Sequence, residues 1–249
     1  MQSPELHRDV TPQAGDIFKS TLDADFFDSL EQRVAGELSA ETGCEKQKEA
    51  VKRILRESGV GDIAKSLARG IQIISVPEGL KYGGGYNRNT GDIRLYADPR
   101  YLRRLLPVIL HELGHGLEQK IALAKDVPEL LNAYLGIVQA ESTAHSPYAE
   151  AYGVRLGRQD KDYILESFAE DFRLFWLNPG SLSDAKRLIL RELVASSLET
   201  IDVNAAQEQI AKFITENMGT SADQLVDELN DQTLSEALVK LDTHLAHAC

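Results

Sequence analysis

Five consecutive residues, His111-Glu112-Leu113-Gly114-His115, combine two imidazoles and a carboxylate in the spacing HExxH. In an α-helix, side chains four residues apart project from one face, so both rings could offer a neutral nitrogen to one Zn²⁺. Glu112 would then lie beside the water that such a metal activates, where it could act as a general base. The motif therefore predicts metal-assisted hydrolysis. The alternative is a buried amphipathic helix whose two histidines only make hydrogen bonds.

The residues around the motif predict the helix that it requires. Apolar side chains recur at three- and four-residue steps, at Leu106, Leu110, Leu113 and Leu117. This periodicity is typical of a helix with one buried face. Pro107 suits the first turn of that helix. Gly114 lowers helix propensity, so we expect another backbone to approach closely at that position.

A catalytic zinc needs a third protein ligand. Glu118 and Ile121 exclude the extended motif HExxHxxGxxH, in which glycine and histidine stand at these positions. Farther along the chain, residues 163–176 predict a second, mostly apolar helix with Glu166 and Glu170 one turn apart. Two neighbouring carboxylates are costly to bury unless a cation compensates them. Glu166 is therefore the candidate third ligand, and Glu170 the candidate acceptor for the free N–H of a ligand histidine. A solvated acidic edge is the alternative for both.

These two motifs together carry a resemblance to a known family. Residues 71–178, with Leu-Pro before HELGH and Glu-Ser-Phe-Ala-Glu-Asp-Phe from Glu166 to Phe172, resemble the zinc peptidases related to the catalytic domain of anthrax lethal factor. That group includes proline–proline endopeptidases. The resemblance implies a gluzincin-type zinc endopeptidase with Glu112 as the general base and a Zn²⁺ bound by His111, His115 and Glu166.

The sequence departs from this family at one position. The family usually has a tyrosine seven residues before the ligand glutamate, where it donates a hydrogen bond to the oxyanion, but Gln159 stands there in this chain. Two other tyrosines could take the role. Tyr163 lies one helical turn before Glu166, and Tyr152 would serve if the connecting loop is longer than in the family. It is also open that neither does so.

The segment before the motif helix predicts strands. Residues 71–76 are apolar and β-branched, which is typical of a buried strand. An Asn/Gly-rich turn at 87–91, followed by alternating apolar and polar residues at 92–96, predicts a hairpin. The resemblance implies that this hairpin supplies the edge strand along which an extended peptide lies, with contacts from Gly84, Gly85 and Tyr86. A hairpin with no functional role is the alternative.

These elements predict an α+β, zincin-like core with helical extensions on both sides. The core combines a small sheet, its edge-strand hairpin, the HExxH helix and the glutamate-bearing helix. We expect a helical N-terminal region at 1–70, the catalytic core at 71–180 and a helical C-terminal region at 181–249. The three regions could equally form one compact unit.

Composition limits the partners of the chain. Its 249 residues carry a net charge of −12 and no basic cluster, so nucleic acid and anionic membranes are unexpected partners. No apolar run is long enough to span a membrane, and the N-terminus lacks an apolar signal segment. Two cysteines, Cys44 and Cys249, offer no disulfide framework. We expect a soluble protein, either cytoplasmic or exported without a cleaved signal peptide, as a housekeeping peptidase or an injected effector or toxin would be.

The sequence thus favours a zinc-dependent metallopeptidase that acts on a peptide or protein. Two alternatives remain open. One is a zincin scaffold that keeps its zinc but recruits a partner through its helical flanks without turnover. The other is a hydrolase of a non-peptide amide.

Overall fold

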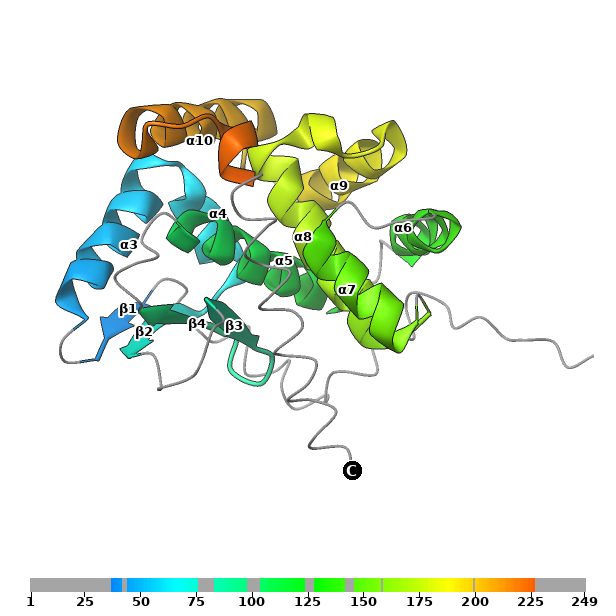
Figure 1. Ribbon diagram of the computed structural model, residues 1–249, viewed down its shortest axis with the longest axis horizontal. Helices are drawn as coiled ribbons and strands as arrows, with labels where there is room; N and C mark the ends of the chain where they lie inside the picture. The colour runs from blue at the N-terminus through cyan, green and yellow to red at the C-terminus, as the bar shows by residue number, and fades with distance from the viewer. Residues whose placement is uncertain are drawn as a thin grey trace, which may run out of the picture.

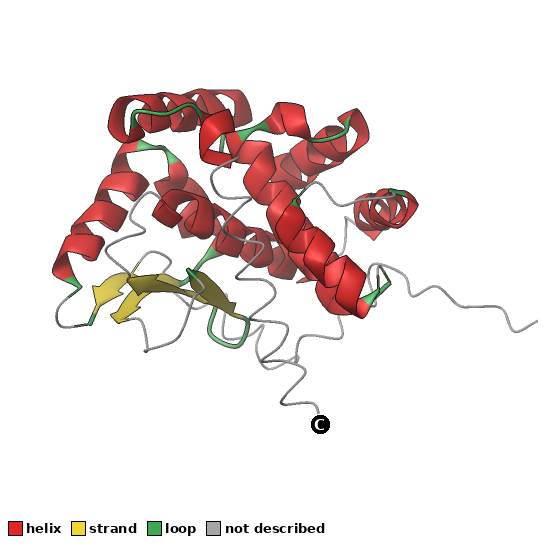
Figure 2. Cartoon of the chain, viewed as in Figure 1, coloured by secondary structure: helices red, strands yellow, loops and turns green. Residues whose placement is uncertain are grey.

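The computed structural model describes residues 37–41, 44–75, 83–97, 104–123, 128–141, 146–157, 159–198 and 200–226. A small sheet occupies one side of the molecule and the helices gather on the other (Figures 1 and 2). In chain order the elements are β1 (Glu37–Ala40), α3 (Glu45–Glu57), α4 (Val60–Leu67), β2 (Gly70–Ser75), β3 (Gly84–Asn87), β4 (Asp92–Ala97), α5 (Leu105–Leu123), α6 (Pro128–Ala140), α7 (Pro147–Leu156), α8 (Lys161–Leu177), η2 (Pro179–Ser181), α9 (Asp184–Ser197) and α10 (Val203–Met218). No helix in these ranges is both long and apolar enough to cross a membrane.

The sheet has the strand order β1-β2-β4-β3. The strands β1, β2 and β4 run parallel, whereas β3 pairs with β4 in the antiparallel sense and forms the edge next to α5. Ile93 and Leu95 of β4 are fully buried, while Arg94 between them is exposed, as the period of a strand requires. In the turn, the Asn87 side chain accepts a hydrogen bond from the Asn89 N–H at 3.0 Å. The predicted hairpin is confirmed.

One local expectation is wrong. Residues 37–40 lie in the region expected to be helical, but they form strand β1, which pairs with β2 from Glu37 opposite Gly70 to Ala40 opposite Ile73. Three of its four residues are good helix formers, so local propensity points away from a strand. The pairing with β2 overrides that propensity because it supplies partners for the backbone groups along the facing edges of the two strands. The helices expected in 14–36 and after residue 226 lie outside the described residues.

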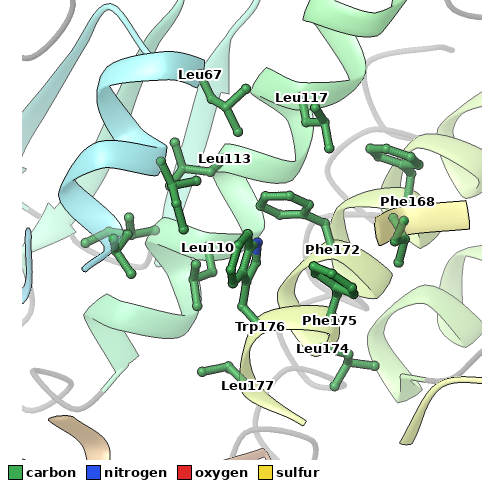
Figure 3. Close-up of a cluster of buried hydrophobic side chains, with 14 of the residues drawn as sticks. Leu67, Leu110, Leu113, Leu117, Phe168, Phe172, Leu174, Phe175, Trp176 and Leu177 are labelled. Carbon is green, nitrogen blue, oxygen red and sulfur yellow. The ribbon is translucent and has the colours of Figure 1, made fainter. Parts of the chain in front are cut away.

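Helices α5 and α8 form the centre of the molecule and pack directly on each other. Their contact is apolar, with leucines of α5 facing the aromatic side chains of α8 (Figure 3). The fully buried members of this contact include Leu110, Leu113, Leu117, Phe168, Phe172 and Trp176. One continuous hydrophobic core extends from there to residues of every predicted region, from Cys44 to Val226. The predicted α+β architecture, with its edge hairpin, motif helix and glutamate-bearing helix, is confirmed.

Candidate metal centre

Helix α5 presents both histidines of the HExxH motif toward α8. The ring centroids of His111 and His115 lie 5.0 Å apart with an interplanar angle of 85°. Gly114, between them, lies where α8 crosses: a Cβ built on it would come within 2.7 Å of the Ala169 Cα. The close approach expected from the sequence is therefore present, and it brings the glutamates that flank Ala169 to the two rings.

Glu166 of α8 completes a three-residue cluster. Its carboxylate oxygens lie 3.3 Å from His111 Nε2 and 3.9 Å from His115 Nε2. The three ligand-type atoms all fall within 4.8 Å of one another, close enough for one ion to contact them all. The side chain of Glu166 is only 12% exposed, so its charge is largely removed from water. The two helices thus gather the residues that the sequence nominated as metal ligands.

The second nitrogen of His111 is already occupied. Its Nδ1–H donates to Glu170 Oε1 at 2.7 Å, and Arg173 donates to Glu170 Oε2 at 2.7 Å, with both acid and base buried. The contact expected between Glu170 and a candidate ligand histidine is present. Because this bond keeps a proton on Nδ1, Nε2, which faces Glu166, is the nitrogen that can give up its proton and bind a metal.

The charges around His111 shift the pKa values of both partners. Burial opposes a charge on the His111 ring, but the hydrogen bonds to Glu166 and Glu170 outweigh it and raise the pKa of His111 to about 10. Burial likewise opposes the charge of Glu170, yet Arg173 and the hydrogen bond from His111 lower its pKa to about 2. A cluster that retains a proton so strongly is one with excess negative charge, and a cation can take the place of that proton.

The donor set fits zinc. Two imidazoles and one carboxylate, leaving a coordination position open, are the ligands of many catalytic Zn²⁺ sites. In this chain the fit rests on two observations: the three ligand-type atoms converge, and the Nδ1–H of His111 is bound to a carboxylate, which leaves Nε2 as the ligand atom.

The opposite side of α8 is held by a buried ion pair. Lys186 of α9 lies 2.6 Å from Asp171 Oδ2 and 2.6 Å from Glu141 Oε2. The Tyr134 hydroxyl donates to the same Asp171 oxygen at 2.8 Å. Helices α6 and α9 therefore fix the position of α8 next to Glu170, which limits how far Glu166 can shift.

Glu112 lies under the edge strand. Its side chain is buried, and a Cβ built on Gly84 of β3 would lie 3.2 Å from Glu112 Oε1 and 2.6 Å from Val108 Cγ1. Only glycine leaves room there, so the backbone of β3 passes directly over the carboxylate. The neighbouring Gly85 has open space around its Cα, and Tyr86 sends its hydroxyl to the Leu67 carbonyl oxygen at 3.4 Å. Tyr86 thus holds the strand against α4.

Sequence reasoning missed Tyr148. Its ring lies edge-on to His111, with the ring centroids 5.6 Å apart. Burial, and next the charge of Glu166, raise the pKa of Tyr148 well above its usual value, with Glu112 contributing in the same direction. The hydroxyl therefore stays protonated at neutral pH and can donate a hydrogen bond. The Ser146-Pro147 helix start before it was the available signal, because it begins α7 at a point that exposes this residue to α5.

The two tyrosines nominated from the sequence have different neighbours. Tyr152 contacts Tyr148, and the hydroxyl oxygens of these two residues are 3.3 Å apart. Tyr163 is fully buried and packs its ring against Gly153 of α7. Tyr163 also contributes, after burial and the charge of Asp171, to the raised pKa of Tyr134 on α6. The role of Tyr163 as oxyanion donor stays a prediction.

A cavity of about 460 Å³ lies elsewhere, between α3, α4 and the strands β1 and β2. None of its lining residues belongs to the histidine–glutamate cluster, and its charged rim is made of exposed side chains already in ion pairs, Lys52 with Glu49 and Lys65 with Asp62. The candidate metal ligands lie outside this cavity, at the crossing of α5 and α8.

The fold and the cluster define an α+β protein with a His₂Glu centre on two crossing helices. No protein-family model matches the chain, and no curated protein matches its sequence. Among solved structures, it is similar to a crystal structure from Bacteroides caccae described as a "putative zinc-binding metallo-peptidase". The two share 14% identity over 86% of this chain and 93% of the other, with a TM-score of 0.36.

Proposed function

We propose that this protein is a zinc-dependent metallopeptidase. The observation that carries the proposal is the convergence of His111, His115 and Glu166 on one point. The charge of Glu112 acts on His111, and Gly84 of β3, which is an edge strand among the described residues, lies over Glu112. Each part has a separate use in peptide hydrolysis: ligands for a metal, a base for water, and a backbone edge for the substrate.

Zinc would be held by the Nε2 atoms of the two histidines and by the carboxylate of Glu166. When bound, it supplies Lewis acidity that polarises a carbonyl group and acidifies water. Glu112 accepts a proton from the attacking water at its carboxylate. It then passes the proton to the nitrogen of the scissile bond, so that the C–N bond breaks and a neutral amine leaves.

Tyr148 takes the role of oxyanion donor in this proposal. Its ring lies against His111. Burial and the negative charges of Glu166 and Glu112 raise the pKa of its hydroxyl, which therefore stays protonated. A hydrogen bond from this hydroxyl to the carbonyl oxygen strengthens as negative charge develops there. Tyr152, whose hydroxyl lies 3.3 Å away, holds that hydroxyl in place.

The substrate would lie along β3 as an added strand. In the described part of the chain β3 pairs only with β4, and Gly83 and Gly85 use their backbone groups in that pairing, so those of Gly84 and Tyr86 face away from β4. An extended peptide that pairs with this edge is held through its main chain. Since Gly84 lies over Glu112, such a peptide would pass its carbonyl groups close to the base and the metal ligands.

The test is hydrolysis of a peptide library by the purified protein, with and without a chelator. We expect about one zinc per chain, cleavage that the chelator abolishes, and recovery on addition of Zn²⁺. Glu112→Gln should keep the metal and lose turnover, whereas Glu192→Gln, which changes an exposed glutamate on α9, should behave as wild type. Zinc binding without cleavage of any peptide would favour the scaffold alternative, and absence of zinc would overturn the proposal.

A further inference from the structure

The second histidine of the motif has a less complete environment than the first. Nδ1 of His115 is buried and has no hydrogen-bond partner, and the side chain is only 9% exposed. An acidic group lies near it: Oε2 of Glu118, one turn farther along α5, is 3.7 Å away. A buried imidazole nitrogen without a partner is unfavourable, and this carboxylate needs to move by less than an ångström to supply one.

Glu118 is held by an arginine from the hairpin. Its side chain is completely buried, and both of its oxygens accept from the Arg88 guanidinium, at 2.5 Å from Nη1 and 2.6 Å from Nη2. This two-pronged contact is the strong geometry for an arginine and a carboxylate. Arg88 lies in the turn between β3 and β4, and its carbonyl oxygen accepts from the Gln119 side chain at 2.9 Å. Three hydrogen bonds therefore join the turn to two adjacent residues of α5.

The two histidines have related surroundings. Each faces a buried glutamate, and each glutamate is neutralised by an arginine: Arg173 for Glu170 and Arg88 for Glu118. They differ in origin, since Arg173 comes from α8 whereas Arg88 comes from the hairpin that carries the edge strand. The environment of His115 thus depends on where the hairpin lies.

We propose that Glu118 and Arg88 are positioning residues that join the metal site to the edge strand. This inference rests on the proposed function. Glu118 accepts the Nδ1–H of His115 when Nε2 binds the metal, which fixes the tautomer and the angle of that ring. Arg88 keeps Glu118 in place and ties the β3–β4 turn to it. Zinc affinity and the binding of an extended peptide are therefore coupled, because both depend on the bidentate contact between Arg88 and Glu118.

The experiment compares wild type with Glu118→Gln and Arg88→Lys. Zinc affinity is measured by competition with a fluorescent chelator, and the geometry at the metal by the absorption bands of the Co²⁺-substituted protein. Glu118→Gln should bind zinc about 10- to 100-fold more weakly, the usual loss when the acceptor for a ligand histidine is weakened. Its Co²⁺ bands should shift, which a purely structural role for Glu118 would not produce. Arg88→Lys keeps the positive charge but cannot make the bidentate contact to Glu118. We therefore expect a smaller loss of zinc affinity than in Glu118→Gln. At saturating zinc, we expect a raised KM with kcat nearly unchanged.

The matched control is Arg53→Gln, which breaks an exposed arginine–glutamate pair on α3, Arg53 Nε to Glu57 Oε2 at 3.0 Å. It should leave zinc affinity, Co²⁺ bands and KM as in wild type. If wild type binds zinc and Glu118→Gln shows the same affinity and bands, the inference fails while the proposed function stands. If Glu118→Gln does not fold, Arg88→Lys decides, and an unchanged KM and zinc affinity would overturn the inference. If wild type binds no zinc, the proposed function itself fails, and the inference with it.

Discussion

Gly114 of α5 lies directly against the backbone of Ala169 of α8, so closely that a Cβ on Gly114 would also come within 3.1 Å of the Ala169 carbonyl oxygen. Gly114 stands between the two histidines, and Ala169 stands between Glu166 and Glu170. This close contact of the two helices is therefore at the level of the cluster, and the distance between their axes decides whether the three ligand-type atoms converge.

The first prediction is that Gly114→Ala weakens both the fold and the metal site. The new methyl group would meet backbone atoms, which cannot rotate away, so α5 and α8 must separate. We expect the free energy of unfolding to fall by about 1–3 kcal/mol, as in other overpacked cores, and zinc affinity to fall with it. Calorimetry and chelator competition measure the two effects.

Gly136→Ala is the control for that experiment. Gly136 lies on an exposed face of α6, and a Cβ built on it meets nothing within 4 Å. The same substitution there should raise the free energy of unfolding by roughly 0.4–1 kcal/mol, because alanine restricts the unfolded chain. Equal effects of the two substitutions would show that the close crossing is not what Gly114 provides.

Much of this site could be predicted from the sequence because its signals are local. The HExxH spacing needs only a helix, and the leucine periodicity around Leu113 predicts one. Glu166 and Glu170 stand out because two carboxylates one turn apart on an apolar helix require a counter-charge. The turn that begins at Asn87 carries its own chemistry, so the hairpin was also predictable.

The remainder depends on contacts between distant parts of the chain. Arg88 and Glu118 are 30 positions apart, and no local pattern joins them. Tyr148 faces His111 because of the direction in which α7 packs, whereas the ring of Tyr163, nearer to Glu166 in sequence, packs against Gly153 of α7. Strand β1 depends on its pairing with β2 and not on the propensity of residues 37–40.

The second prediction concerns the metal ligands. His111→Ala and Glu166→Ala should each abolish tight zinc binding, since each removes one of three ligands. Metal content after gel filtration, measured by atomic emission, gives the result directly. Full zinc occupancy in the double variant His111→Ala/His115→Ala would contradict the assignment of the site.

The third prediction is a pH dependence that zinc removes. The pKa of His111 is raised to about 10, above the ordinary value of 6.5, so the protonated ring stabilises the metal-free fold. That stabilisation is complete below about pH 6.5 and is lost as the pH rises through 10. The ionisable groups that face the ring come from α5, α7 and α8: Glu112, His115, Tyr148, Glu166 and Glu170.

We therefore expect the Tm of the metal-free protein to fall between pH 7 and 10, by scanning calorimetry in the presence of a chelator. The zinc-loaded protein should show a flatter curve, because the metal takes the place of the proton. His111→Gln should flatten the curve of the metal-free protein as well. The same steep slope with and without zinc would argue that His111 is not a ligand.

The fourth prediction separates the tyrosines. Tyr148→Phe should lower kcat by roughly 10²-fold with little change in KM, the usual loss of one oxyanion donor. Tyr152→Phe should lower it less, since its hydroxyl contacts that of Tyr148. Tyr163→Phe should leave turnover unchanged and reduce only stability, by about 1 kcal/mol. Steady-state kinetics on one cleaved peptide decides, and a large loss confined to Tyr163→Phe would return the role to that residue.

The ligands of the proposed zinc lie on either side of α6 and α7 in the chain, with His115 before these helices and Glu166 after them. An ion bound by both residues closes a long loop. The segment between them then gains less conformational entropy when it unfolds locally, so local unfolding becomes less favourable. The strands, which lie before His115, are outside that loop. Removal of zinc should therefore speed amide hydrogen exchange first in α6 and α7, while the sheet stays protected.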